Sequence, residues 1–173
     1  MTYHSSFAIL VGCLLAACAH SSAPPATTAM QFEKLQCNTG TIPQYDARLL
    51  KETTIIKVDP LYSHVHSSYN DYEARVNGAT LLVHAPRDVS PSQMTKALQC
   101  HSARAALGQV DPAHLDTDPY YLPEASLDIM VEPRDDNYAV TVRAHNVHDG
   151  LEVLAHANAQ SAYQNSTAGS IAP

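Results

Sequence analysis

The sequence predicts an α+β fold, a two-layer sandwich in which an antiparallel sheet carries two helices on one face. Three observations predict this class. Two stretches alternate between apolar and polar residues around turn signals. Two further stretches carry helix caps and helical periodicity. These stretches follow one another in the order hairpin, helix, hairpin, helix, which is typical of helices that cover an antiparallel sheet.

The first predicted hairpin lies in "YEARVNGATLLVHA". Its Asn-Gly pair at 77–78 favours a two-residue turn, because both turn positions need a positive φ. That register would place Val76 opposite Ala79 on the buried face and Asp71 opposite His84 on the other face. A further strand is expected just before this hairpin, at 54–58.

The helix that follows has clear caps at both ends. Ser90 is the expected N-cap, Pro91 occupies the first helical position and Gln93 completes a capping box. Gly108 is a typical residue just past a helix C-terminus. The sequence therefore predicts a helix over 91–107.

The second half of the domain repeats this pattern. In "SLDIMVEPRDDNYAVTVRAH" alternating apolar residues run into and out of the turn at "PRDDN", which predicts a second hairpin. Asn146 is the expected N-cap of a helix over about 147–163. We expect this helix to pack on the sheet through an apolar stripe of Leu151, Leu154 and Ala155.

The N-terminus carries an export signal. The run from Phe7 to Ala17 is apolar or small, and it is shorter than the roughly 20 residues that span a bilayer. It ends in Leu15-Ala16-Ala17-Cys18, which resembles the lipobox of bacterial lipoproteins. The resemblance implies that Cys18 is acylated and becomes the first residue of the mature protein. Ala at position 19, in place of Asp, implies sorting to the outer membrane.

These features divide the chain into a signal peptide at 1–17, a flexible tether at 18–30, one α+β domain at 31–165 and a disordered tail at 166–173. The expected location is the periplasmic side of the outer membrane. The small residues around Cys18 also fit cleavage without acylation, so a soluble periplasmic protein is the alternative. The signal has no Lys or Arg before its apolar run, which leaves the true start codon open.

The charge of the chain limits its partners. It has 10 Lys and Arg against 17 Asp and Glu, a formal net charge of −7, with no basic cluster. Such a chain is a poor partner for nucleic acid and for anionic headgroups. We therefore expect the lipid anchor to be its contact with the membrane, with an envelope protein as a further partner.

The cysteines other than Cys18 divide between the signal peptide and the domain. Cys13 lies in the signal, which leaves Cys37 and Cys100 in an oxidising compartment. Two such cysteines favour a disulfide, which would join the N-terminal segment to the helix at 91–107.

His101 follows Cys100 directly, but adjacent residues of a helix point in different directions. On the helix at 91–107, His101 shares a face with the residues expected to contact the sheet. A core histidine bonded to a carbonyl or carboxylate explains this position, and a buried functional imidazole is the alternative.

Other histidines have spacings that suit metal ligands. His64 and His66 are two apart, so in a strand both rings leave the same face, as copper or zinc ligands could. His148, Glu152 and His156 are each four apart on the last predicted helix. A polar edge strand and a solvated helix face explain the same spacings without metal.

Catalysis finds little support in the sequence. It contains no GxSxG, Walker or HExxH motif. We expect a non-catalytic domain that binds a protein or another ligand through a sheet edge or through tyrosine-rich loops at 59–71 and 110–125. A periplasmic copper- or zinc-binding protein is the first alternative, and a small hydrolase built around Asp71 and His84 or around His101 is the second. The oligomeric state stays open.

Overall fold

The computed structural model of the chain describes residues 25–37, 49, 53–66 and 72–169. The predicted signal peptide, the lipobox and Asp71 lie outside these residues. The elements in chain order are α1 (Pro25–Phe32), a π-helix η1 (Glu33–Cys37), β1 (Ile55–His66), β2 (Tyr72–His84), α3 (Pro91–Ala106), a 3-10 helix η2 (Pro112–Thr117), β3 (Leu127–Arg134), β4 (Asn137–Ala144) and α4 (Val147–Gly169).

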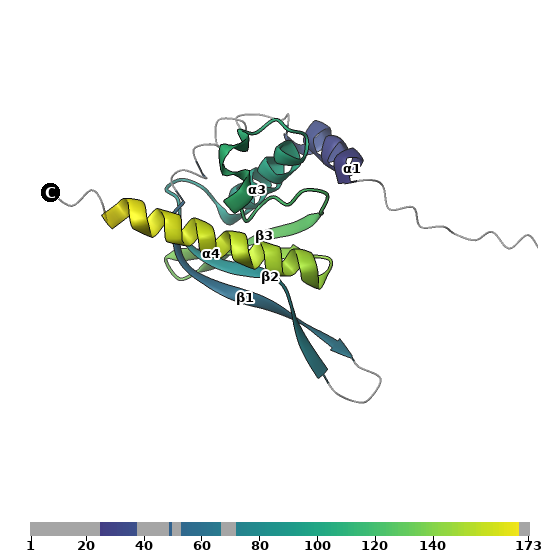
Figure 1. The fold of residues 1–173 in the computed structure, drawn as a ribbon. Coiled ribbons are helices and arrows are strands. Elements are labelled where there is room, and N and C mark those ends of the chain that lie inside the picture. The colour runs from purple at the N-terminus through teal and green to yellow at the C-terminus, as the bar shows by residue number, and fades with distance from the viewer. Residues whose placement is uncertain (1–24, 38–48, 50–52, 67–71, 170–173) are drawn as a thin grey trace, which may run out of the picture.

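The four strands form one antiparallel sheet in the order β1-β2-β4-β3. The predicted α+β class is therefore confirmed, and the order hairpin, helix, hairpin, helix holds with β1 and β2 as the first hairpin. Strands β2 and β4 pair at the centre of the sheet, and β1 and β3 are its edges. Figure 1 shows the far ends of β1 and β2 projecting beyond the rest of the molecule.

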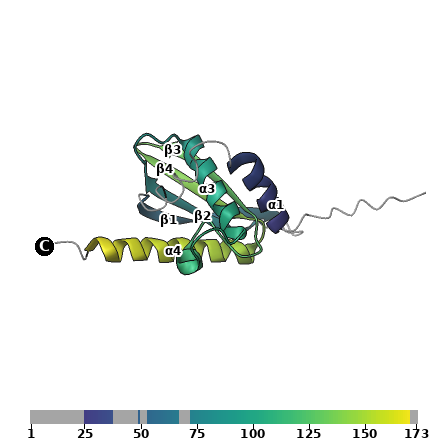
Figure 2. The same cartoon turned by 90° about the horizontal axis from the view of Figure 1, so that it is seen from above.

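One buried cluster joins the sheet to its helices. Alternate residues of the central strands point into it, among them Leu81 and Val140. Met94 and Leu98 of α3 and Val153 of α4 belong to the same cluster. α4 packs mainly on β2 and β1, α3 packs on β3, and α1 lies beside α3 (Figure 2).

The hairpin predicted within 72–84 is wrong. This stretch is one continuous strand, β2, and its partners are β1 and β4. Tyr62 pairs with Val76 and Leu61 pairs with Gly78, so Asn77 is the extra residue of a β-bulge. His84 accordingly lies opposite Asn137 of β4 and not opposite Asp71.

Two backbone segments come so close at this bulge that both Gly78 and Gly150 must lack a side chain. Gly78 has φ 154°, and a Cβ there would lie 2.0 Å from the main-chain oxygen of Val142. Gly150 of α4 lies against the same bulge, where its Cβ would be 2.4 Å from the Cα of Asn77. The Asn-Gly pair therefore serves tertiary packing, and the chain reverses elsewhere.

The first predicted helix and the second hairpin are confirmed. Ser90 caps α3, with both hydrogen bonds of the capping box to Gln93 present. The second hairpin turns between Arg134 and Asn137, with Asp135 at φ 54°. Its strands pair in the register that the alternation requires, with Val131 opposite Val140.

The expected apolar stripe of α4 is partly wrong, although its N-cap is confirmed. Leu154 packs against the core as expected, but Leu151 and Ala155 are exposed. Asn146 Oδ1 accepts a hydrogen bond from the amide of Asp149. Leu151 is 51% exposed, whereas Val153 and Ala157 are fully buried. Because Gly150 lies against the backbone of β2 at Asn77, the residues three and seven positions later face the sheet. The helix also continues to Gly169, past the expected start of the tail at 166.

The N-terminal helices and the predicted disulfide lie together against α3. Cys37 and Cys100 are bonded, with an S–S distance of 2.09 Å and a Cα–Cα distance of 5.6 Å. The structure differs from the expected tether over residues 25–30, which begin α1 and pack on α3. Among the described residues, no helix has the length and apolar character needed to cross a membrane.

Candidate functional site

A groove of about 600 Å³ runs between α1, α3 and the edge strand β3. Thr28, Ala29 and Phe32 of α1 form one wall, because their spacing places them on one face of that helix. The groove continues over the edge of β3, where its lining combines apolar residues with polar ones: Gln99, Ser102, Ala103, Ala106, Ala125, Ser126, Leu127, Asp128, Ile129, Met130, Thr141, Arg143 and His145.

The chemistry of this groove is that of a binding site. Phe32, Leu127 and several alanines supply apolar surface, while Arg143 and Asp128 supply charges of opposite sign from adjacent strands. Mostly apolar hollows of 300–1,000 Å³ with a few polar groups are typical of ligand sites in proteins. Met130 lies in the lining and is 51% exposed, so it offers accessible apolar surface.

Side chains of α3 occupy part of the edge of β3. Gln99 Nε2 donates to the main-chain oxygen of Ile129 at 2.9 Å, and the amide of Val131 donates to Thr95 Oγ1 at 3.0 Å. Pro133, on the same strand, has no amide hydrogen to offer. Because these groups already have partners, a peptide cannot pair with β3 along its length, and a ligand of the groove must bind through side chains.

A second cluster of titratable groups lies in the interior. His101 Nε2 and Asp118 Oδ2 are 2.5 Å apart, and their side chains are 6% and 11% exposed. The other carboxylate oxygen of Asp118 accepts from the amide of Tyr120 at 2.9 Å. His156 Nδ1 donates to the main-chain oxygen of Asp118 at 3.0 Å. Asp118 therefore ties the loop after η2 to both α3 and α4.

Tyr120, next to this cluster, is buried in the core. Its burial, and secondarily the charge of Asp118, raise the pKa of its phenol above the ordinary value of 10.0. The phenol is neutral at physiological pH. Of the two loops expected to present tyrosines, this one places Tyr120 inside, and much of the other is strand β1, which leaves Tyr62 54% exposed.

The cluster around His101 has a histidine oriented by a carboxylate, which an enzyme needs, but lies outside the lining of the groove. Its contacts match the core histidine expected from the sequence. For the other hydrolase proposal, His84 Nδ1 lies 3.2 Å from Asn137 Oδ1, and Asp71 lies outside the described residues.

Among the described side chains, the histidines proposed as metal ligands do not gather at one point. His64 is exposed near the far end of β1, and the side chain of His66 lies outside the described part. His101 and His156 both turn to Asp118. The expected three-residue set on α4 is therefore incomplete, since His156 leaves it.

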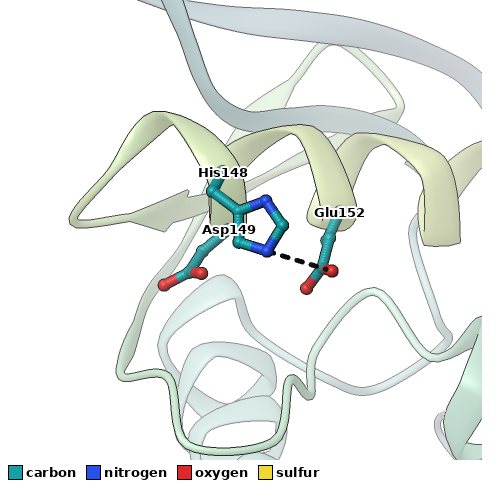
Figure 3. Close-up of side chains that lie close together, drawn as sticks. All are labelled: His148, Asp149 and Glu152. Carbon is teal, nitrogen blue, oxygen red and sulfur yellow. Dashed lines mark ion pairs between the residues drawn. The ribbon is translucent and has the colours of Figure 1, made fainter.

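His148 and Glu152 do come together, and Asp149 joins them (Figure 3). Their nearest ligand atoms all lie within 4.8 Å of one another, with His148 Nε2 3.5 Å from Glu152 Oε1. Figure 3 shows the imidazole between the two carboxylates. Asp149 also accepts a hydrogen bond from Asn146 Nδ2 at 2.7 Å, which is part of the N-terminal cap of α4.

Sequence reasoning missed Asp118, Asp149 and the groove. The register of the second hairpin places Asp128 opposite Arg143, and this pair of opposite charges could have pointed to the groove. Nothing in the sequence distinguishes Asp118 from Asp111 or Asp116 nearby. The wall formed by α1 depends on a helix in a segment whose composition suggested a tether.

Comparison with models of known protein families, with curated proteins and with solved structures found no match for this chain. The function must therefore be inferred from the residues themselves.

Proposed function

We propose that this chain is a lipoprotein of the outer membrane that faces the periplasm, and that its domain binds a ligand or a protein partner in the groove without catalysis. The anchor is supported by the resemblance of Leu15-Ala16-Ala17-Cys18 to a lipobox. The bond between Cys37 and Cys100 suits an oxidising compartment such as the periplasm.

The groove between α1, α3 and β3 is the observation that carries the binding function. It is of ligand size, and its accessible side chains combine apolar surface with Arg143 and Asp128. The hydrogen bonds that Thr95 and Gln99 make to β3 direct a partner to these side chains in place of the strand edge. An amphipathic ligand, such as a peptide with an apolar side chain next to a charge, matches this lining.

Site-specific crosslinking in cells tests the binding function. A photoreactive amino acid at Met130 should give a discrete adduct, because this exposed side chain lies in the groove. The same amino acid at Tyr163, which is 58% exposed on α4, is the matched control. Arg143→Ala should reduce the yield of the Met130 adduct. Equal labelling from Met130 and Tyr163, or no adduct from either, would contradict binding in the groove.

The anchor has a separate test. Mass spectrometry of the protein from the envelope should show a mature chain that begins at an acylated Cys18. A chain that begins after Cys18, or a Cys18 without acyl groups, would rule out the lipoprotein class.

Binding of a transition metal is a second candidate, favoured by the cluster of His148, Asp149 and Glu152. A zinc ion bonds to nitrogen and oxygen ligands at about 2.0–2.2 Å, and the 3.5 Å between His148 Nε2 and Glu152 Oε1 fits one ion between them. Zinc titration by calorimetry should show one site that is lost in Glu152→Gln and kept in His64→Asn. Identical isotherms for these variants would remove this candidate.

A further inference from the structure

The most exposed large apolar side chains in the described part of the chain lie in one short segment. Leu35 is 70% exposed and Met30 is 59% exposed, ahead of every other large apolar residue described. Both belong to the continuous helical segment formed by α1 and η1. Exposed apolar side chains that gather on one face are typical of a contact surface.

This segment is attached to the domain at several points. The disulfide to Cys100 fixes its end, and Arg104 Nη2 donates to the main-chain oxygen of Cys37 at 3.4 Å. Its inner face, with Ala29 and Phe32, lines the groove. Met30 therefore lies on the outer face, and neither Met30 nor Leu35 turns inward.

The segment also lies close to the proposed lipid. Seven residue steps separate Cys18 from Pro25, where α1 begins. A chain of this length spans at most about 25 Å when fully extended. Acyl groups on Cys18 would hold α1 within this distance of the bilayer, nearer along the chain than any other described element.

The charge of the outer face differs from that of the whole protein. The chain carries a net charge of −7, yet the exposed residues Thr27, Met30, Gln31, Lys34 and Leu35 include one charge, and it is positive. Bilayers with anionic lipids have a negative surface potential that attracts lysine and repels carboxylates. Among surfaces near the anchor, this face is suited to a phospholipid membrane.

We propose that the outer face of α1 and η1 docks on the phospholipid surface to which Cys18 is anchored, with Met30 and Leu35 in the interfacial layer and Lys34 beside the headgroups. This inference rests on the anchoring at Cys18 in the proposed function, and it revises the expectation that the lipid is the sole membrane contact. Docking would orient the domain so that the α1 wall of the groove lies next to the membrane.

Nitroxide accessibility tests the docked face. The chain from Cys18 onward is coupled through that thiol to a maleimide lipid in vesicles of phosphatidylethanolamine and phosphatidylglycerol, so the experiment does not depend on acylation in cells. A nitroxide is carried by a ketone-bearing amino acid at Gln31. On coupling to vesicles, its collisions with oxygen should rise and its collisions with a water-soluble nickel chelate should fall. The same label at Leu151 of α4 should not change.

Two double variants complete the test. Met30→Ser with Leu35→Ser should lower the ratio of docked to undocked protein about tenfold, as expected when two partly buried apolar side chains are truncated. Leu151→Ser with Tyr163→Ser removes comparable exposed apolar surface from α4 and should leave the ratio unchanged. Equal accessibility at Gln31 with and without vesicles, or equal behaviour of the two variants, overturns the proposal. Absence of acylation in cells would instead refute the anchor, which the mass of Cys18 reports separately.

Discussion

The two halves of the sheet have the same order of elements but hold their helices in different ways. In the first unit, β1 and β2 precede α3, and in the second, β3 and β4 precede α4. The helix of each unit bonds to the edge strand of the other: Gln99 of α3 to Ile129 on β3, and Gln164 of α4 to Ile55 on β1. The units therefore share their edge contacts, and neither is complete alone.

The two helices differ in the further contacts that hold them on the domain. α3 is backed by α1 and η1 and is bonded to Cys37. α4 is contacted by the short helix η2, and Gly150 brings its backbone against the bulge of β2. One helix is secured by a covalent bond and the other by close packing, so a separate substitution tests each.

The largest expected effect is loss of the disulfide. Cys37→Ser with Cys100→Ser should lower the free energy of unfolding by about 4 kcal/mol, because the bond closes a loop with a sequence separation of 63. Hydrogen exchange should show that residues 25–37 lose protection before α4 does. Denaturation in urea measures the free energy, and unchanged protection of α1 would show that packing alone holds it.

Asp118 bonds to α3 through its carboxylate and to α4 through its main-chain oxygen, so replacing its side chain removes the contact with α3 directly. Asp118→Ala leaves His101 and the amide of Tyr120 without their partner and should cost about 3 kcal/mol. Asp116→Ala, at an exposed position in the same loop, is the control and should cost little. Hydrogen exchange should show a larger loss of protection in α3 than in α4, because the main-chain oxygen that accepts from His156 remains. Equal losses in both helices would show that the whole loop shifts.

Gly150→Ala tests the packing of α4. A Cβ there would lie 2.4 Å and 2.6 Å from two main-chain atoms of Asn77, so helix and strand must separate, at a cost of about 2 kcal/mol. Gly108→Ala has open space around the new Cβ. Its free energy of unfolding should fall only by the strain of a side chain at φ +67°, about 1 kcal/mol. Thermal unfolding of both variants measures the difference. Equal losses of stability in the two variants would show that the close contact of Gly150 with Asn77 does not restrict the packing of α4.

The smallest effects should come from the edge contacts. Gln99→Ala and Gln164→Ala each remove side-chain hydrogen bonds to an edge strand, worth about 1 kcal/mol. Combining Gln99→Ala with Thr95→Ala frees two main-chain groups of β3 and should also promote self-association, which sedimentation measures. No association would indicate that Pro133 is sufficient to protect this edge.

The elements that sequence predicted well are those set by local chemistry. Ser90 and Gln93 form a capping box from residues three apart, and the second hairpin turns within a few residues. The Asn-Gly pair at 77–78 misled because its glycine is required by close contacts with Val142 and Gly150, which are distant in sequence, and not by a turn. A local pattern cannot reveal that a backbone from elsewhere approaches so closely.

The candidate sites divide in the same way. The pairing of Cys37 with Cys100 followed from compartment and elimination, and the inward direction of His101 followed from helical geometry. The partner of His101 could not be predicted, because Asp118 reaches it from a loop without regular pattern. The groove needs α1 to be placed against α3, which depends on tertiary contact.

The pairing of β2 with β4 has a consequence for the order in which the chain can fold. Gly78 pairs with Arg143, so the central pair of the sheet closes only when the last third of the chain is present. Contacts this distant in sequence carry a high loop-closure entropy and slow folding. A chain that crosses a membrane from its N-terminus onward would expose the inner face of β2 until β4 arrives. The topology thus favours a late, concerted folding transition, which begins only when the whole domain is available.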